Sequence, residues 1–254
     1  MVPLTPELYL EAVKHLSAAD ADFARLCEAH GVPEMRTREA GFAALLRVIV
    51  EQQLSVASAR AIWGRLERAM GEPTPTALLA LDDKALKACG LSGPKMRYAR
   101  GLAEDIASGR VDLAGLDAMD DETAIAELIK LKGIGRWTAE IYLLASLGRP
   151  DVFPVDDLAV AAAASHLKGR RTRFSRRHLL KLCEAWRPWR SVAARLLWHY
   201  FRSAMMGPGR PRVGPPRKRK RIKASEAKAA APRGSKRRVL PSVKPKARRR
   251  RKSR

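Results

Sequence analysis

The sequence is poor in cysteine and has no long apolar run. Its three cysteines, Cys27, Cys89 and Cys183, are far apart and too few for a disulfide scaffold or a four-cysteine zinc or iron–sulfur site. No apolar run reaches the roughly 18 residues of a membrane span. The first residues also lack the basic and apolar regions of a signal peptide. We therefore expect an intracellular protein without a membrane partner, in the cytoplasm or nucleoid if bacterial, which the Ala/Arg-rich composition favours, or in the nucleus if eukaryotic.

Strand signals and cofactor motifs are also missing. The chain has no alternating β-branched runs joined by Asn-Gly turns, which predicts an all-α fold. It has no Walker or dinucleotide-binding glycine motif. The five histidines lack the spacing of metal ligands, and no His-x-Glu accompanies paired cysteines, which excludes a zinc deaminase. We predict no metal site from these residues.

Acidic residues are scarce, and the imbalance lies at one end of the chain. The sequence has 50 Lys and Arg against 26 Asp and Glu, a net charge of +24. Residues 207–254 hold 21 of the basic residues and one acid, so they carry +20, whereas residues 1–206 carry only +4. Proline and glycine follow Met206, and large apolar residues become rare. These features predict a globular domain over 1–206 and a disordered basic tail over 207–254.

Apolar residues recur at helical spacing throughout the first 206 residues. Capping residues and short connections between the helical segments are typical of a compact helical domain. The helices that we predict are 5–16, 20–29, 37–54, 55–70, 75–81, 83–88, 94–108, 121–129, 136–147, 157–167, 175–185 and 191–204.

A Gly-x-Gly turn lies between two of these helices, in the segment 131–139, which reads LKGIGRWTA. Two glycines allow a ligand to approach the backbone closely, and the N-terminus of the next helix offers free amides to an anion. Taken alone, Gly-Ile-Gly is more typical of an ordinary corner between helices.

An acidic pair follows in the segment 152–160, which reads VFPVDDLAV. An aspartate before an apolar helix is usually its N-cap. A carboxylate there can also face a cleft, where the helix dipole favours its ionised form. Twenty residues separate Trp137 from Asp157, enough for one helix and a return loop. This spacing can bring the carboxylate back beside the Gly-x-Gly turn.

These two motifs, together with the segment 186–191, WRPWRS, closely resemble the DNA-3-methyladenine glycosylase II family of the helix-hairpin-helix (HhH-GPD) superfamily. The resemblance covers about residues 40–204. It implies two helical lobes around a DNA-binding cleft, with the hairpin near 131–137. It also implies a monofunctional glycosylase that flips out 3-methyladenine and related N-alkylpurines and hydrolyses the N-glycosidic bond. The product is an abasic site for base excision repair.

The resemblance assigns a role to each residue of the acidic pair. Asp157 is implied to be the catalytic carboxylate, which stabilises the positive charge that develops on the deoxyribose. Asp156 is expected to cap the helix or shape the loop. In bifunctional relatives a lysine nucleophile occupies the position of Trp137, so the indole implies that no strand cleavage follows base release.

The base pocket implied by the resemblance is Trp137, Trp198, Ile141 and Leu158. Stacking of a cationic alkylated purine on Trp198 is worth about 0.5–2 kcal/mol. Ile141 and Leu158 stand where the best-known bacterial member has tyrosines, so we expect a less aromatic pocket. Without the resemblance, Trp137 and Trp198 would be interpreted as core aromatics. Trp186 and Trp189 are expected to be structural.

Further residues are implied to contact DNA. Those of the hairpin are Gly133, Ile134, Gly135, Arg136 and Thr138. The segment 51–55, EQQLS, matches the wedge that fills the gap left by the flipped nucleotide, with Gln53 at the wedge position and Leu54 as the alternative. Lys95 is a candidate for one more contact with the DNA backbone.

The expected partner is double-stranded DNA with alkylated bases, bound by a monomer, while the basic tail holds DNA regardless of sequence. No cofactor and no iron–sulfur cluster are expected, although the superfamily includes members with a monovalent cation held by hairpin carbonyls. Two alternatives stay open: a non-catalytic DNA-binding helix-hairpin-helix module, and a glycosylase for deaminated or mismatched bases. Release of base from methylated DNA separates them.

Overall fold

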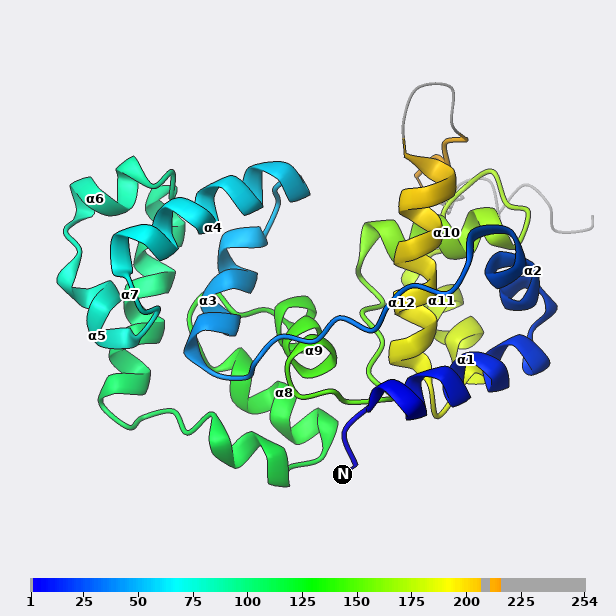
Figure 1. Ribbon diagram of the computed structural model, residues 1–254, viewed down its shortest axis with the longest axis horizontal. Helices are drawn as coiled ribbons and strands as arrows, with labels where there is room; N and C mark the ends of the chain where they lie inside the picture. Colours follow the sequence, from blue (N-terminus) through cyan, green and yellow to red (C-terminus); the bar gives the residue numbers. More distant parts are fainter. Residues whose placement is uncertain (1, 207–210, 216–254) are drawn as a thin grey trace, which may run out of the picture. The chain divides into compact units, whose positions relative to one another are not determined.

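The computed structural model describes residues 2–206 and 211–215, and this part of the chain is helical almost throughout (Figure 1). Its α-helices are α1 (Pro6–Ala19), α2 (Ala21–His30), α3 (Phe42–Glu51), α4 (Val56–Met70), α5 (Pro75–Ala80), α6 (Asp83–Ala88), α7 (Gly93–Ala107), α8 (Asp121–Ile129), α9 (Arg136–Ala145), α10 (Leu158–Leu167), α11 (Arg176–Cys183) and α12 (Arg190–Tyr200). Short helical turns are η1 (Ala114–Ala118), η2 (Glu184–Trp186) and η3 (Phe201–Met205). The predicted all-α class is confirmed.

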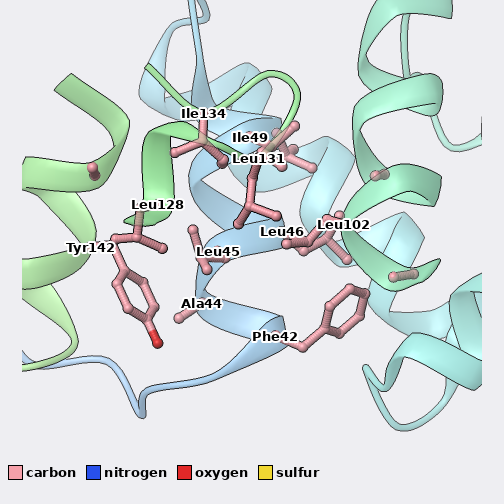
Figure 2. Packing of buried hydrophobic residues seen from close by; sticks show 14 of the residues in the cluster. Phe42, Ala44, Leu45, Leu46, Ile49, Leu102, Leu128, Leu131, Ile134 and Tyr142 are labelled. Atoms are coloured by element: carbon pink, nitrogen blue, oxygen red, sulfur yellow. The ribbon is translucent and has the colours of Figure 1, made fainter. Parts of the chain in front are cut away.

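The first hydrophobic cluster surrounds α3, which packs against α4, α7 and α9 (Figure 1). Figure 2 shows Leu45 and Leu46 of α3 between Tyr142 of α9 and Leu102 of α7, with Leu128 and the hairpin residues Leu131 and Ile134 close by. Every apolar side chain of α3 that the sequence places at helical spacing is buried here. The hairpin is thus fixed to this core by its own apolar residues.

The second hydrophobic cluster surrounds α12, which packs against α1, α2 and α10. Both ends of the domain therefore build this cluster, because α1 and α2 come from the start of the chain and α10 to α12 from its end. The two clusters correspond to the two predicted lobes.

Helix α9 belongs to both clusters. Leu143 is buried in the first cluster and its neighbour Leu144 in the second. Adjacent residues of a helix point about 100° apart, so one helix can serve two cores. The N-terminus of α9 is the end of the Gly-x-Gly turn, so the turn has a fixed position relative to both cores.

Several predicted helices are shorter in the structure than in the sequence-based prediction, among them 37–54 and 191–204. The segment 37–41 is not helical, and α3 begins only at Phe42, because Gly41 adopts φ +119°. The amide of Gly41 donates a hydrogen bond to the Tyr142 hydroxyl (2.9 Å), which holds this segment extended beside α9. The other helix, α12, ends at Tyr200, and η3 continues it as a π-helical turn.

Beyond the predicted domain boundary at Met206, residues 211–215 still pair with the loop that precedes α11. The backbone amide of Arg173 donates to the Gly214 carbonyl (2.8 Å), and the Gly214 amide donates to the Arg171 carbonyl (3.1 Å). The predicted disorder of the basic tail lies outside the described residues, apart from 211–215. No helix of the described residues is long and apolar enough to cross a membrane.

Candidate active site and nucleic-acid interface

The Asp157 carboxylate lies where three helices meet. As the N-cap of α10, it accepts hydrogen bonds at Oδ1 from the amides of Ala159 (2.9 Å) and Val160 (2.8 Å). Oδ1 also accepts from Nε1 of Trp198 on α12 (3.2 Å), and Oδ2 accepts from Nε1 of Trp137 on α9 (3.0 Å). All four donors are N–H groups, so the arrangement suits an ionised carboxylate at a helix N-terminus.

The loop before Asp157 is anchored by buried side chains. The hydroxyl of Ser191, in the first turn of α12, donates to the Val152 carbonyl (2.8 Å) and accepts from the Val152 amide (3.0 Å). Phe153 and Val155 are buried in the second cluster. The loop directly before Asp157 is therefore held both by hydrogen bonds to Ser191 and by its own buried apolar side chains. The sequence analysis did not assign this role to Ser191, whose only signal was its place at a predicted helix start.

Three of the four tryptophans singled out in the sequence divide into two kinds, and the fourth, Trp189, is partly buried against the second cluster. Trp137 and Trp198 are half-buried, with their indole N–H groups on Asp157. Trp186 is fully buried, packs edge-on against Phe23, and donates to Asp20 (3.1 Å). Trp186 is thus structural, as predicted, whereas Trp137 and Trp198 are neither simple core aromatics nor free stacking surfaces.

The prediction that Asp156 caps the helix is wrong, because Asp157 itself is the cap. Asp156 instead pairs with Arg176 at the start of α11 (3.1 Å), and both side chains are about half exposed. An exposed ion pair of this kind contributes little to stability. The ion pair does hold the Asp156 carboxylate against the first residue of α11.

The two glycines of the hairpin are required for different reasons. Gly133 has φ +90°, and a Cβ there would clash with the ring of Tyr98, so the fold itself demands glycine. Gly135 has φ −94° and open space around its Cα, so the folded chain would tolerate a side chain. It is also the exposed N-cap of α9, with no side-chain cap. The first amides of α9 are therefore open to an outside acceptor.

The side chain of Arg136 is occupied within the protein. Its guanidinium pairs with Glu122 (3.0 Å) and with Glu140 (2.9 Å), and the hydrogen bond that it donates to Glu122 raises the pKa of Arg136 above its usual value. Burial raises the pKa of Glu140 to about 7, against the pull of Arg136. What Arg136 can offer to a ligand at the hairpin is therefore its amide.

Gln52 connects the predicted wedge region to the hairpin. Its side-chain Nε2 donates to the Gly133 carbonyl (3.0 Å) and to the hydroxyl of Thr138 (2.9 Å). Thr138 is buried, so its hydroxyl serves this contact. The sequence analysis missed Gln52, because nothing in the motif distinguishes it from Gln53.

Gln53 and Leu54 lie at the exposed tip of this loop. Gln53 adopts φ +56°, the left-handed region that costs a non-glycine residue roughly 1–2 kcal/mol, and no other described non-glycine residue has a positive φ. Leu54 is 39% exposed. Beneath the tip, the ammonium of Lys95 donates to the carbonyls of Val50 (2.8 Å) and Gln52 (2.7 Å). Lys95 thus closes the end of α3, and its contact with the DNA backbone stays a prediction.

The two aliphatic pocket candidates differ in exposure. Ile141, on α9, is buried. Leu158 is 68% exposed, directly after Asp157. Among the described residues, no group of three or more His, Cys, Asp or Glu side chains is placed to hold a metal ion.

A helix-hairpin-helix turn that opens beside a helix-capping aspartate defines a class of DNA repair proteins. Residues 46–188 match the family model described as "HhH-GPD superfamily base excision DNA repair protein", and the chain belongs to this superfamily. The family membership predicted from the sequence motifs is confirmed.

Within this superfamily, the chain is similar to several 3-methyladenine DNA glycosylases. DNA-3-methyladenine glycosylase 1 of Schizosaccharomyces pombe is 31% identical over 191 residues, which cover 72% of this chain and 84% of the relative. The solved structure of the Schizosaccharomyces pombe 3-methyladenine DNA glycosylase Mag1 in complex with abasic DNA matches with a TM-score of 0.72 and covers 76% of this chain and 98% of that one. The DNA-3-methyladenine glycosidase of Bacillus halodurans matches with a TM-score of 0.65 and 36% identity, over 76% of this chain and 89% of its own.

Proposed function

We propose that this protein is a monofunctional DNA glycosylase that removes alkylated bases, chiefly 3-methyladenine and related N-alkylpurines, from double-stranded DNA. The observation that carries the proposal is the Asp157 carboxylate, which accepts hydrogen bonds from two indoles, Trp137 directly after the hairpin and Trp198 on α12. A DNA-binding module without catalysis would need neither the carboxylate nor the indoles. The similarity to 3-methyladenine glycosylases supports the substrate class.

The reaction breaks the bond between C1′ of the deoxyribose and the base nitrogen. The bonding electron pair leaves with the alkylated base, whose positive charge it neutralises, and positive charge develops on the sugar ring. A carboxylate held in fixed position next to that charge lowers the barrier without reorganisation. Water then adds to C1′ and releases a proton, which leaves an abasic site.

The two oxygens of Asp157 are unequal. Within residues 2–206 and 211–215, Oδ1 accepts three hydrogen bonds, whereas Oδ2 accepts only one, from Trp137. A carboxylate oxygen has about two lone-pair positions, so Oδ2 keeps the free acceptor capacity. We assign Oδ2 to the sugar and the attacking water, and Oδ1 to holding the carboxylate in place.

The absence of strand cleavage follows from the same contacts. Both side chains that donate to Asp157 are indoles, and an indole nitrogen is no nucleophile. Without an amine at the hairpin position, no Schiff base with the sugar forms. We expect no covalent adduct on treatment with borohydride, and efficient trapping would contradict the monofunctional assignment.

Selectivity for alkylated bases is proposed to come mainly from the substrate. N-alkylation makes the purine cationic and weakens its glycosidic bond, while a stacking contact with an indole adds only about 0.5–2 kcal/mol. The pocket candidates Ile141 and Leu158 are aliphatic, so they contribute shape rather than aromatic stacking. We therefore propose a broad range of N-alkylpurines.

The hold on DNA is proposed to come from the hairpin and the loop tip. The uncapped amides of α9 suit a phosphate, because they combine free N–H groups with the positive end of the helix dipole. Gln53, with Leu54 beside it, is proposed to fill the gap left by the flipped nucleotide. The basic residues of the tail add attraction that does not depend on sequence, and the protein is proposed to act as a monomer.

A monovalent cation at the hairpin also fits the backbone. The Leu131 carbonyl accepts a hydrogen bond from the Ile134 amide, and the Gly133 carbonyl accepts one from Gln52, which leaves each oxygen a second lone pair. Such an ion would add positive charge beside the phosphate site. The chemistry proposed for Asp157 does not depend on it.

The proposal is tested by release of base from methylated DNA and from oligonucleotides with single defined lesions. Replacement Asp157→Asn keeps the shape but removes the charge and one acceptor, so we expect base release to fall by about 100-fold or more. Binding to a duplex with a stable abasic analogue should persist. If wild type releases no base and the Asn variant behaves identically, the protein is not a glycosylase.

A matched control is Asp156→Asn, the neighbouring carboxylate that faces Arg176 rather than the indoles. We expect this variant to release base at close to the wild-type rate. A loss as large as that of the Asp157 variant would show that the catalytic carboxylate has been assigned to the wrong residue.

A further inference from the structure

A shallow groove of about 450 Å³ begins one residue after the proposed catalytic carboxylate. Three elements form its apolar lining, which consists of Leu158, Ala159 and Ala162 of α10, Phe201 and Met205 of η3, and Pro211 and Val213 of the returning C-terminal segment. Phe201 and Met205 lie three and seven residues after Trp198, on the π-helical turn that continues α12. The groove and the Asp157 site therefore share the start of α10 and the helical stretch that carries Trp198.

The two charged residues of the groove are both cationic. Arg173 lies in the loop before α11, and Arg212 lies in the returning segment that pairs with this loop through Gly214. Neither has a carboxylate within 4.0 Å in the part of the chain that the structure describes. The Nε atom of Arg173 is buried and has no hydrogen-bond partner among the described residues. By contrast, Arg136 and Arg176, near the same site, are each paired with acids.

An unpaired buried guanidinium nitrogen is costly unless a ligand satisfies it. A pair of unpartnered arginines selects an anion, and their forked donors match a phosphate. The apolar floor of the groove suits a group with one uncharged face. Both properties occur together in a DNA strand, where each phosphodiester adjoins a deoxyribose.

We propose that this groove binds a phosphodiester and its deoxyribose from the lesion-bearing strand, within two nucleotides of the flipped base. Arg173 and Arg212 bind the phosphate, and the apolar lining takes the sugar. The inference rests on the proposed function, because Asp157 fixes where the flipped nucleotide lies. It makes residues 211–215 part of the DNA-binding surface, distinct from the hairpin on α9 and from the tail beyond Pro216.

The test measures binding of the full chain to a duplex with a stable abasic analogue, over a range of salt concentrations. Replacement of both arginines, R173Q with R212Q, removes one phosphate contact. We expect affinity to fall about tenfold and the slope of log affinity against log salt to decrease by about one. The control R68Q removes an exposed charge from the last turn of α4, and it should leave both quantities nearly unchanged.

The position of the phosphate is tested by replacing single phosphates near the analogue with neutral methylphosphonates. At one position, wild type and R68Q should lose affinity while the double variant does not, which identifies the phosphate bound by the arginines. Because Arg212 is exposed, R212Q alone should fold normally and show part of the effect. Equal losses for all variants at every position would overturn the groove assignment.

Failure of this inference and failure of the proposed function give different results. The binding experiment requires no base release. Whether the loss of affinity on neutralising one phosphate depends on the two arginines can therefore be measured even if the protein has no glycosylase activity. Conversely, normal base release with no such coupling would leave the glycosylase proposal intact and contradict only the groove.

Discussion

Asp157 combines two roles that are usually treated as alternatives for such a residue. It caps α10 through Oδ1, and the same carboxylate receives both indoles. Capping is what fixes the carboxylate, because two backbone amides hold it with no side-chain freedom left. A residue that looks structural by its local position is therefore placed well for chemistry by that same position.

Substitution can separate the contribution of the Trp198 N–H group from that of its aromatic face. Replacement Trp198→Phe keeps a stacking surface but removes one donor to Asp157. A hydrogen bond to a charged group is worth about 1.5–3 kcal/mol, so we expect kcat to fall about tenfold or more with little change in KM. Single-turnover release from a defined lesion measures this.

Trp198→Ala provides the comparison, because it removes the donor and the aromatic face together. This variant should lose affinity for the lesion as well, so its KM should also rise. If the Phe variant releases base at the wild-type rate, the contact between Trp198 and Asp157 does not contribute to catalysis.

The buried carboxyl group of Glu140 is expected to make the stability of the folded protein depend on pH. Burial raises its pKa from 4.5 to about 7, so the folded protein binds this proton more tightly than the unfolded chain does. The stability contributed by the protonated form is complete below about pH 4.5 and is lost as pH rises to about 7. Relative to wild type, Glu140→Gln should gain up to about 3 kcal/mol in unfolding free energy across this window. Urea unfolding at several pH values measures the difference.

Glu122→Gln is the matched control, since Glu122 pairs with the same arginine but is 70% exposed. Its difference from wild type should change little over that window. A pH-independent difference between Glu140→Gln and wild type would contradict the buried-carboxyl explanation.

At the scale of elements, the hairpin contains one glycine that the fold requires, Gly133, and one that we propose the ligand requires, Gly135. Gly133→Ala forces a clash with Tyr98 at a positive φ, and we expect it to lower stability by at least 1–2 kcal/mol, an order-of-magnitude figure. Gly135→Ala meets no neighbour, so its stability should match wild type while its affinity for DNA falls. Thermal unfolding and binding to an abasic duplex distinguish the two.

The opposite result for this pair would contradict the proposed role of the α9 N-terminus. Specifically, a Gly135→Ala variant that binds DNA as tightly as wild type would mean that no ligand approaches closely there. The comparison is internal, since both changes add one methyl group within three residues.

Capping residues and apolar spacing are local signals, so they predicted the positions of most helices, whereas the catalytic role of Asp157 is implied by the family resemblance and stays a prediction. The sequence did not predict the extended segment 37–41, whose conformation depends on Tyr142, about a hundred residues away. Nor did it distinguish Gln52 from Gln53, or Asp156 from Asp157 as the helix cap. Those differences depend on which partner each side chain meets in the folded protein.

At the scale of the whole molecule, the net charge is distributed between the domain and the tail. Residues 217–254 carry 19 basic residues and one acid. Removing them should leave base release from a short saturating duplex intact, while weakening DNA binding and flattening its salt dependence. The measurement compares full-length protein with a chain that ends at Pro216.

A chain that ends at Met206 tests the boundary itself. It also loses the returning segment with Arg212, so it should bind the abasic duplex more weakly than the chain that ends at Pro216. If the shorter truncation abolishes chemistry on a saturating duplex, residues 211–215 are needed for the active site itself.

The second hydrophobic cluster contains residues from both ends of the domain. The parts of the site around Asp157 therefore become available in a fixed order during synthesis. The hairpin and all but the last residues of the first cluster, Leu147 and Val152, are present once α9 has been made, but α1 and α2 must wait for α12 before their apolar faces are covered. The last donor to Asp157, on Trp198, arrives with that same helix. A nascent or prematurely ended chain therefore carries the hairpin before it carries all the donors to Asp157, so we expect base release only from a chain that includes α12.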